Sequence, residues 1–209
     1  MSMYLPKHFK NENLAAVHAV IQTSGLATLV TTGADRIQAS HVPMVFEPGE
    51  GAQGALYGHI ARANHQWRET SSTPALAIFM GPDAYITPSW YPSKAVMGKV
   101  VPTWNYVAVH ATGPVTWFND ADQLLSVVTR LTQRHEKDRP KPWAVSDAPP
   151  EFTAQLLKAI VGFRLEITTL EGKWKMNQSA APADRRGVVA GLKAAGREDV
   201  ADIIEKASP

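Results

Sequence analysis

The stretch that decides the fold begins at Tyr85 with YITPSWYPSK and continues, from residue 101, with VPTWNYVAVHATG. Proline lacks the backbone N–H that a sheet ladder uses, so the region from Pro88 to Pro102 is predicted to be a loop. After Pro102 the rings of Trp104 and Tyr106 fall on one face of an alternating pattern, which is the period of a strand. The stretch therefore predicts a strand beside a loop that is rich in rings and hydroxyls.

This combination of side chains favours an aromatic, phosphorylated ligand. Flat rings can stack on a heterocycle, and the hydroxyls and the Lys94 cation can bind a phosphate. The same composition also fits an aromatic hairpin that packs its own core. Composition alone leaves both interpretations open.

The length of the chain fits one large domain, or one domain with a small appendage. The chain has 209 residues, of which 44% are hydrophobic and 19% are charged, with a formal net charge of +2. That charge is too close to balance to argue for a nucleic-acid partner. With no cysteine, disulfides, Cys-ligated zinc, iron–sulfur clusters and thiol nucleophiles are excluded. No signal-like or membrane-spanning apolar run is found, so a cytoplasmic protein without a membrane partner is expected.

The hydrophobic pattern predicts short strands with helices inserted between them. Strands are expected at 26–32 and 37–46 as a hairpin, and at 55–60, 75–80, 84–87, 103–118 and 162–170. Helices are expected after a cap at Asn11, at 64–67, after a cap at Asn119, at 151–160 and twice in 182–208. Residues 81–83 are expected to form a turn and 134–150 a long loop. The buried stripe of the helix after Asn119 is expected to comprise Ala121, Leu124, Leu125, Val128 and Leu131.

This order of elements predicts a mainly β fold, an antiparallel barrel decorated by helices. Strands follow strands, and no Gly-x-Gly-x-x-Gly follows a strand, so a doubly wound parallel sheet is not expected. Residues 1–180 are expected to form the barrel domain. Residues 181–209 are expected to form a C-terminal helical extension that packs on the barrel or on a dimer partner.

The segment from His59 to Asn64 is a candidate phosphate site. His59 and Ala61 share one face of a strand end, and Arg62 precedes a helix expected to begin at Asn64. A guanidinium next to the free N–H groups of a helix start can hold a phosphate. The alternative is a surface arginine beside an ordinary helix cap.

Two further segments carry polar groups at strand ends. Ser40 and His41 precede Pro43, which implies an edge or a bulge where backbone groups are free for a ligand. In the segment 173–178, KWKMNQ, two lysines flank a tryptophan and can steer an anion, while Asn177 and Gln178 can hydrogen-bond a heterocycle. Each segment also fits a plain strand end.

Other chemistries find little support. His41, His59 and His110 match no metal-binding spacing, and no Gly-x-Ser-x-Gly nucleophile elbow is present. The two tail helices around Gly196 suggest a helix-turn-helix. The second of them, however, carries acidic residues that would repel DNA phosphates, so covering a core or a dimer contact is the favoured role.

Several of these motifs together resemble the PaiB family of FMN-binding negative transcriptional regulators. The motifs, in matching order, are YLPKHF at 4–9, GHIARAN at 58–64, YITPSWY at 85–91, VPTWNY at 101–106, KWKMNQ at 173–178 and ADRRG at 183–187. The resemblance implies a six-stranded antiparallel Greek-key split β-barrel that forms a homodimer and binds FMN between subunits. His65 and Ser179 stand where the family motifs have Pro and Asn.

The resemblance also implies a set of flavin-binding residues, with catalytic residues unknown. Ser40 and His41 would line the flavin, Gln178 would come from the partner subunit, and the others would lie near the phosphate, ring or ribityl chain of the flavin. The full set is Ser40, His41, His59, Ala61, Arg62, Asn64, Ser89, Trp90, Tyr91, Lys94, Thr103, Trp104, Asn105 and Gln178.

Three functions follow from this resemblance. The first is a flavin-binding regulator, whose effect on transcription is direct or indirect, since DNA is left open as a partner. The second is an FMN-dependent oxidoreductase, in which the flavin supplies the redox chemistry. The third is a haem-binding or haem-degrading protein with a histidine ligand.

Overall fold

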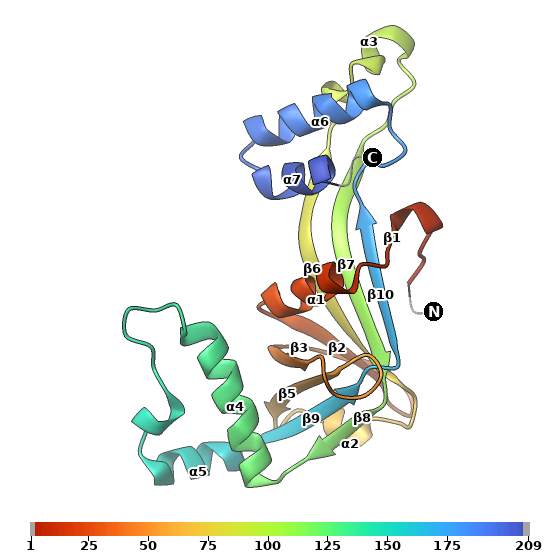
Figure 1. Ribbon diagram of the computed structural model, residues 1–209. Helices are drawn as coiled ribbons and strands as arrows, with labels where there is room; N and C mark the ends of the chain where they lie inside the picture. The colour runs from red at the N-terminus through yellow and green to blue at the C-terminus, as the bar shows by residue number, and fades with distance from the viewer. Residues whose placement is uncertain (1–2, 207–209) are drawn as a thin grey trace. The chain divides into compact units, whose positions relative to one another are not determined.

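The computed structural model describes residues 3–206 (Figure 1). The described residues separate into two compact units. The first unit comprises residues 21–79 and 110–170, and the second comprises residues 3–20, 80–109 and 171–206. The boundary expected at residue 180 stays a prediction.

The elements are mostly short strands, as expected. The strands are β1 (Lys10–Asn11), β2 (Ala27–Thr32), β3 (Ile37–Val42), β4 (Met44–Glu47), β5 (Ala55–Ala61), β6 (Ala75–Ile86), β7 (Thr103–Gly113), β8 (Val115–Phe118), β9 (Ile160–Glu166) and β10 (Thr169–Lys175). The helices are α1 (Leu14–Thr23), α2 (Gln66–Glu69), α3 (Ser93–Met97), α4 (Ala121–Glu136), α5 (Pro150–Lys158), α6 (Pro182–Ala194) and α7 (Glu198–Lys206). Three 3₁₀ turns are η1 (Lys7–Phe9), η2 (Pro88–Trp90) and η3 (Val145–Asp147).

The strands form two sheets. One has six strands in the order β1-β10-β7-β6-β2-β3, and the other has four in the order β4-β5-β9-β8. The predicted hairpin is present, since β2 and β3 pair antiparallel from Ala27 opposite Val42 to Thr32 opposite Ile37. The mainly β, antiparallel fold class is confirmed.

Two prolines divide runs that were predicted as single strands. The run 37–46 breaks at Pro43 into β3 and β4, and the run 103–118 breaks at Pro114 into β7 and β8. In each case the first part joins the six-stranded sheet and the second joins the four-stranded sheet. A proline interrupts the ladder, so the chain can leave one sheet and enter the other at that residue. The edge or bulge expected at Pro43 is thus a change of sheet.

The turn expected at 81–83 is wrong, because β6 runs through it. Pairing with β2 covers Leu76 to Ile78, so the later part of that edge has no β2 partner and tolerates Pro82. A Cβ added at Gly81 would lie 2.9 Å from Val107 Cβ, which shows how closely β7 approaches. The single strand expected at 162–170 is also wrong, because β9 ends at Glu166 and β10 begins at Thr169.

Helix ends follow the cap chemistry, displaced by one or two residues from the prediction. Asn13 Oδ1 accepts from Ala16 N at 3.2 Å, so Asn13 rather than Asn11 caps α1. Asp120 rather than Asn119 caps α4, with its Oδ1 2.9 Å from Gln123 N. The buried stripe of α4 comprises Leu124, Val127 and Leu131, and Leu125 is 38% exposed.

Smaller differences concern the predicted loops and the shortest helix. Helix α2 begins at Gln66, two residues after the expected start. The region from Pro88 to Pro102 contains no strand, as predicted, but includes η2 and α3. The long loop expected from residue 134 begins after α4 ends at Glu136 and contains η3.

The two tail helices lie side by side in Figure 1 and take part in the core of the second unit. This core cluster has ten buried members, and five of them come from the tail: Val188, Leu192, Val200, Ala201 and Ile204. The other five are Ala84, Ile86, Tyr91, Val107 and Met176. Burying a large aliphatic side chain stabilises a fold by about 1.5–3 kcal/mol. Helix α6 is also close to η2, because Cβ atoms added at Gly187 and Gly191 would lie 2.1 and 2.3 Å from atoms of Trp90.

Candidate functional site

The predicted flavin residues fall into two groups, one in each compact unit. The first unit holds Ser40, His41, His59, Ala61, Arg62 and Asn64, and the second holds Ser89, Trp90, Tyr91, Lys94, Thr103, Trp104, Asn105 and Gln178. Within each group, some side-chain polar atoms already have a hydrogen-bond partner in the protein and others do not. A buried polar group without one is the place where a ligand gains most.

In the first unit, Ser40 and Asn64 belong to a closed polar network around Gln66. Asn64 Nδ2 donates to Ser40 Oγ at 2.8 Å, and Ser40 Oγ donates to Gln66 Oε1 at 2.6 Å. Gln66 Nε2 donates to Thr31 Oγ1 at 3.0 Å, and Gln66 is 1% exposed. The predictions missed Gln66, since a glutamine in the first turn of a short helix gives no sequence signal of burial.

Arg62 is bound by the protein itself. Its Nε donates to Lys158 O at 2.6 Å, its Nη1 to Asn119 Oδ1 at 2.8 Å and its Nη2 to Ile160 O at 2.8 Å. Arg62 borders a cavity of about 400 Å³ together with Asn119 and Lys158. A guanidinium has five N–H donors, so three of the donors of Arg62 are occupied. Its proposed role at the phosphate stays a prediction.

The two predicted histidines of the first unit differ in their surroundings. His41 is exposed, with its Nδ1 3.0 Å from Thr28 Oγ1. His59 is half-buried, and burial lowers the pKa of its imidazole below the usual range. The neutral ring of His59 is therefore favoured near pH 7. Ala61 is exposed at the end of β5. Within residues 3–206 no three histidine or carboxylate side chains are grouped as metal ligands.

In the second unit, three of the predicted residues border one cavity of about 410 Å³. These are Tyr91, Thr103 and Asn105, and Lys175, Asn177 and Asp184 border the same cavity. Ligand pockets span about 300–1,000 Å³, so this volume suits a small molecule.

Asn105 is the exceptional residue of this cavity. It is 0% exposed, yet neither its Nδ2 nor its Oδ1 has a hydrogen-bond partner in the described part of the chain. An unpaired buried group costs about 1–3 kcal/mol. A ligand that pairs with the Asn105 amide would remove this cost.

Around Asn105 the cavity wall is fixed by hydrogen bonds. Lys175 Nζ donates to Thr103 Oγ1 and, at 2.7 Å, to Trp104 O, which leaves one of its three N–H donors for another acceptor. Asn177 Nδ2 is 3.1 Å from Tyr91 Oη. Lys175 and Asn177 belong to the motif at 173–178, so their polar character was visible in the sequence although their place in the cavity was not.

Asp184 and Lys173 have fixed partners. The Asp184 carboxylate accepts from Ser93 N at 3.0 Å and from Ser93 Oγ at 2.8 Å. Lys173 is 7% exposed and donates to Tyr4 O at 2.9 Å, so it stabilises the fold and does not steer an anion.

The remaining predicted residues of the second unit do not border this cavity. Trp90 packs on α6, Ser89 and Lys94 are exposed, and Trp104 makes an edge contact with Tyr85 at 5.8 Å between ring centroids. Gln178 is engaged locally, since its Oε1 accepts from Met176 N at 2.7 Å and its Nε2 donates to Trp174 O.

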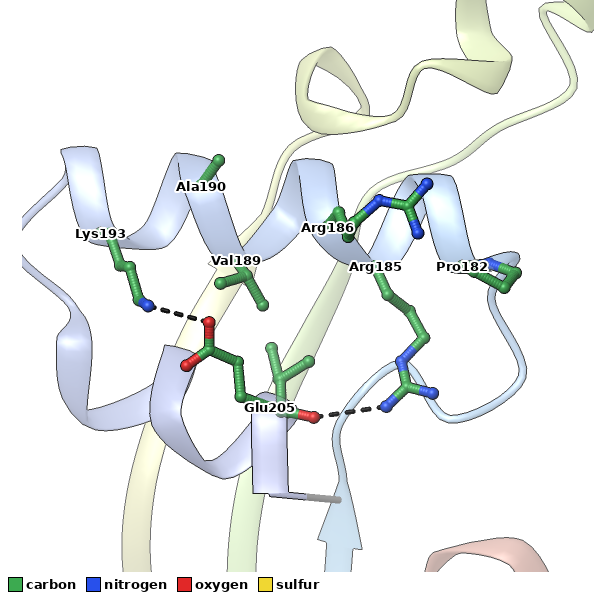
Figure 2. Close-up of a pocket in the computed structure, with 8 residues that line it drawn as sticks. Pro182, Arg185, Arg186, Val189, Ala190, Lys193 and Glu205 are labelled. Atoms are coloured by element: carbon green, nitrogen blue, oxygen red, sulfur yellow. Dashed lines mark hydrogen bonds and ion pairs between the residues drawn. The ribbon is translucent and has the colours of Figure 1, made fainter. Parts of the chain in front are cut away.

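A second cavity of this unit, of about 560 Å³, lies between α6 and α7, and its lining residues are drawn in Figure 2. It carries Arg185, Arg186 and Lys193 on α6, and two of these cations bind α7. Arg185 Nη2 donates to Ile204 O at 3.3 Å, and Lys193 Nζ is 2.8 Å from Glu205 Oε1. Two of the three cations of this cavity are therefore already bound to groups of the tail itself.

Comparison with known proteins supports a flavin-related fold. The family model described as "Putative FMN-binding domain" matches residues 3–169. The chain is 32% identical over 192 residues, 91% of this chain and 89% of the relative, to protease synthase and sporulation protein PAI 2 of Bacillus subtilis (strain 168).

Two solved structures share the fold at low identity. The conserved hypothetical protein Rv2991 from Mycobacterium tuberculosis has a TM-score of 0.59 at 11% identity, over 86% of this chain and 94% of that chain. The FAD and heme binding protein from Mycobacterium smegmatis has a TM-score of 0.56 at 13% identity, over 87% and 80%. None of the helices described is long and apolar enough to cross a membrane. By the family match and the PAI 2 relative, the chain belongs to the PaiB-type family of FMN-binding domains.

Proposed function

We propose that this protein is a homodimeric, FMN-binding negative regulator of transcription of the PaiB type. The observation that carries the proposal is the extent of the match, because the relative PAI 2 aligns over 91% of this chain and 89% of its own length. A match of this length includes the elements that build both compact units. It therefore supports a shared role more strongly than one shared motif would.

The cavity of the second unit fits part of an FMN molecule. Asn105 offers an unpaired donor and an unpaired acceptor, and Lys175 offers a cation that has one N–H left for a ligand. When bound, FMN supplies one- and two-electron redox chemistry. The residues of the chain would hold and orient the flavin and keep water from the bound edge.

Regulation is proposed to be indirect. Helix α7, the second helix of the tail, carries Glu198, Asp199, Asp202 and Glu205, and such a surface repels the phosphates of DNA. The cations of α6 partly bind α7, as described above. The proposed regulator would thus act through another protein, with flavin binding as the sensed event.

The test is a titration of the purified protein with FMN, followed by desalting and a visible absorption spectrum. We expect saturable binding and a flavin spectrum that survives desalting. If no flavin is retained and no titration saturates, the FMN role is refuted. Adding NADH or NADPH to the same sample tests the oxidoreductase alternative, and adding haemin tests the haem alternative.

DNA binding is tested separately with promoter fragments. Direct contacts to phosphates lose affinity steeply between about 50 and 200 mM salt. We expect no salt-dependent shift of the fragments in a gel, with or without FMN. A sequence-selective, salt-dependent shift would refute indirect regulation and leave FMN binding unaffected.

A further inference from the structure

We propose that the cavity beside Asn105 binds the lactam edge of a planar heterocycle, and that the Asn105 amide selects this edge. A lactam edge presents a ring N–H and a ring C=O side by side. Where the heterocycle is the flavin ring, the inference rests on the proposed function. A second, separate ligand with the same edge would use the same residues.

The argument begins with the chemistry of the amide. The Asn105 side chain has a C=O acceptor and an NH₂ donor next to each other, and both lack a partner among the described residues. A lactam edge offers the complementary donor and acceptor at matching spacing, so two parallel hydrogen bonds can form. Asparagine reads the paired donor and acceptor of adenine in the same bidentate way.

The backbone on either side of Asn105 is held by contacts of its neighbours. On one side, Trp104 O accepts a hydrogen bond from Lys175 Nζ at 2.7 Å. Further along the strand, Val107 is 1% exposed and belongs to the core cluster of the second unit. A receptor that is fixed before binding loses little conformational entropy when the ligand arrives.

Asn177 contributes a positioned polar side chain to the same cavity. Among the described residues it is the one non-glycine with a positive φ, 56°. Asparagine is one of the residues that adopt this left-handed backbone readily, because its short side chain can hydrogen-bond locally. Its Nδ2 is 3.1 Å from Tyr91 Oη. The turn and this contact thus fix a polar side chain at the cavity that Asn105 also borders.

The charges of the cavity favour a ligand that is anionic at one end. Lys175 and Lys99 contribute cations, while the carboxylate of Asp184 is bound to Ser93. We therefore expect the anionic end of the ligand beside Lys175 and the neutral lactam edge against Asn105.

The experiment compares three ligands by calorimetric titration: FMN, FMN methylated at ring N3, and uridine 5′-monophosphate. The N3-methyl group removes the lactam donor, and the uridine nucleotide has a lactam edge and a phosphate without a flavin. The proteins are the wild-type chain, Asn105→Leu and Asn105→Asp. Gln123→Leu is the control, because it removes an exposed amide from α4.

We expect the wild-type protein to bind FMN about tenfold more tightly than N3-methyl-FMN, the factor for one lost hydrogen bond. Asn105→Leu should weaken FMN binding by about tenfold or more and abolish the preference, and Gln123→Leu should change neither. Asn105→Asp, which keeps the acceptor and loses the donor, should retain part of the preference. Asn105→Leu should melt at or above the wild-type temperature without ligand, since it removes an unpaired buried amide.

The outcomes separate the inference from the proposed function. Uridine nucleotide binding that depends on Asn105, with FMN binding that does not, supports the lactam site and assigns it to a second ligand. If the affinity for FMN is changed neither by the Asn105 substitutions nor by the N3-methyl group, and the uridine nucleotide does not bind, the inference is overturned and the proposed function is left intact. Failure of every ligand to bind wild-type protein overturns both.

Discussion

Replacing Gln66 with leucine should destabilise the protein by about 2 kcal/mol. The change keeps the side-chain volume but removes three hydrogen bonds within 3.2 Å, to Ser40, Thr31 and Leu29. At about 1 kcal/mol each they amount to about 3 kcal/mol. Leucine returns about 1 kcal/mol because it is the more apolar side chain at a site that is 1% exposed.

The assay for Gln66→Leu is urea unfolding followed by tryptophan fluorescence. With an m-value of about 2 kcal/mol/M, the midpoint should fall by about 1 M. Gln123→Leu is the matched control, since an exposed substitution should stay within about 0.5 kcal/mol. If the two variants have the same midpoint, the network around Gln66 contributes no stability and the reasoning fails.

Three other perturbations follow from the same structure. Asp184→Ala should lower the free energy of unfolding by about 3 kcal/mol, because it leaves Ser93 N and Oγ unpaired, and Ser93→Ala should lower it by about 1 kcal/mol. Equal melting temperatures of these two variants would contradict this. Gly113→Ala should lower the yield of folded protein, because its Cβ would lie 1.7 Å from Glu166 O in the backbone; a normal circular dichroism melt would refute it. Burial lowers the pKa of His59, so the free energy of unfolding should fall as the pH drops from about 7.5 to 5.5. His59→Gln should make this fall smaller. Profiles of unfolding free energy against pH that are parallel for wild type and variant would contradict the prediction.

The sequence predicted the strands well because alternation and proline are local signals. Pro43 was interpreted as an edge or a bulge, whereas the strand predicted at 103–118 ran through Pro114. The change of sheet at each proline depends on pairing partners far away in the chain. The turn predicted at Pro82 was wrong because β6 tolerates a proline beyond Ile78, where it no longer pairs with β2, and the alternation does not reveal where that pairing ends.

The candidate site was predictable in part. Resemblance to a family pointed to Asn105, whereas its lack of any partner is a property of the packed cavity. Arg62 has the residue type of a phosphate ligand, but its guanidinium donates to Lys158 O, Asn119 Oδ1 and Ile160 O. No local sequence pattern predicts these hydrogen bonds, because the acceptors are far away in the chain. Gln66 went unnoticed for the opposite reason, since its residue type suggests exposure and the structure buries it.

The tail helices have a genetic consequence. The family model ends at residue 169, yet α6 and α7 supply half of the buried members of the core cluster in the second unit. A premature stop codon shortly after that boundary would remove these side chains together with Met176, and would leave Tyr91 and Val107 facing water. Nonsense mutations in the codons for α6 should therefore abolish accumulation of the protein as surely as those in the codons for β7, whereas missense changes at the exposed positions of α7 should have little effect on it.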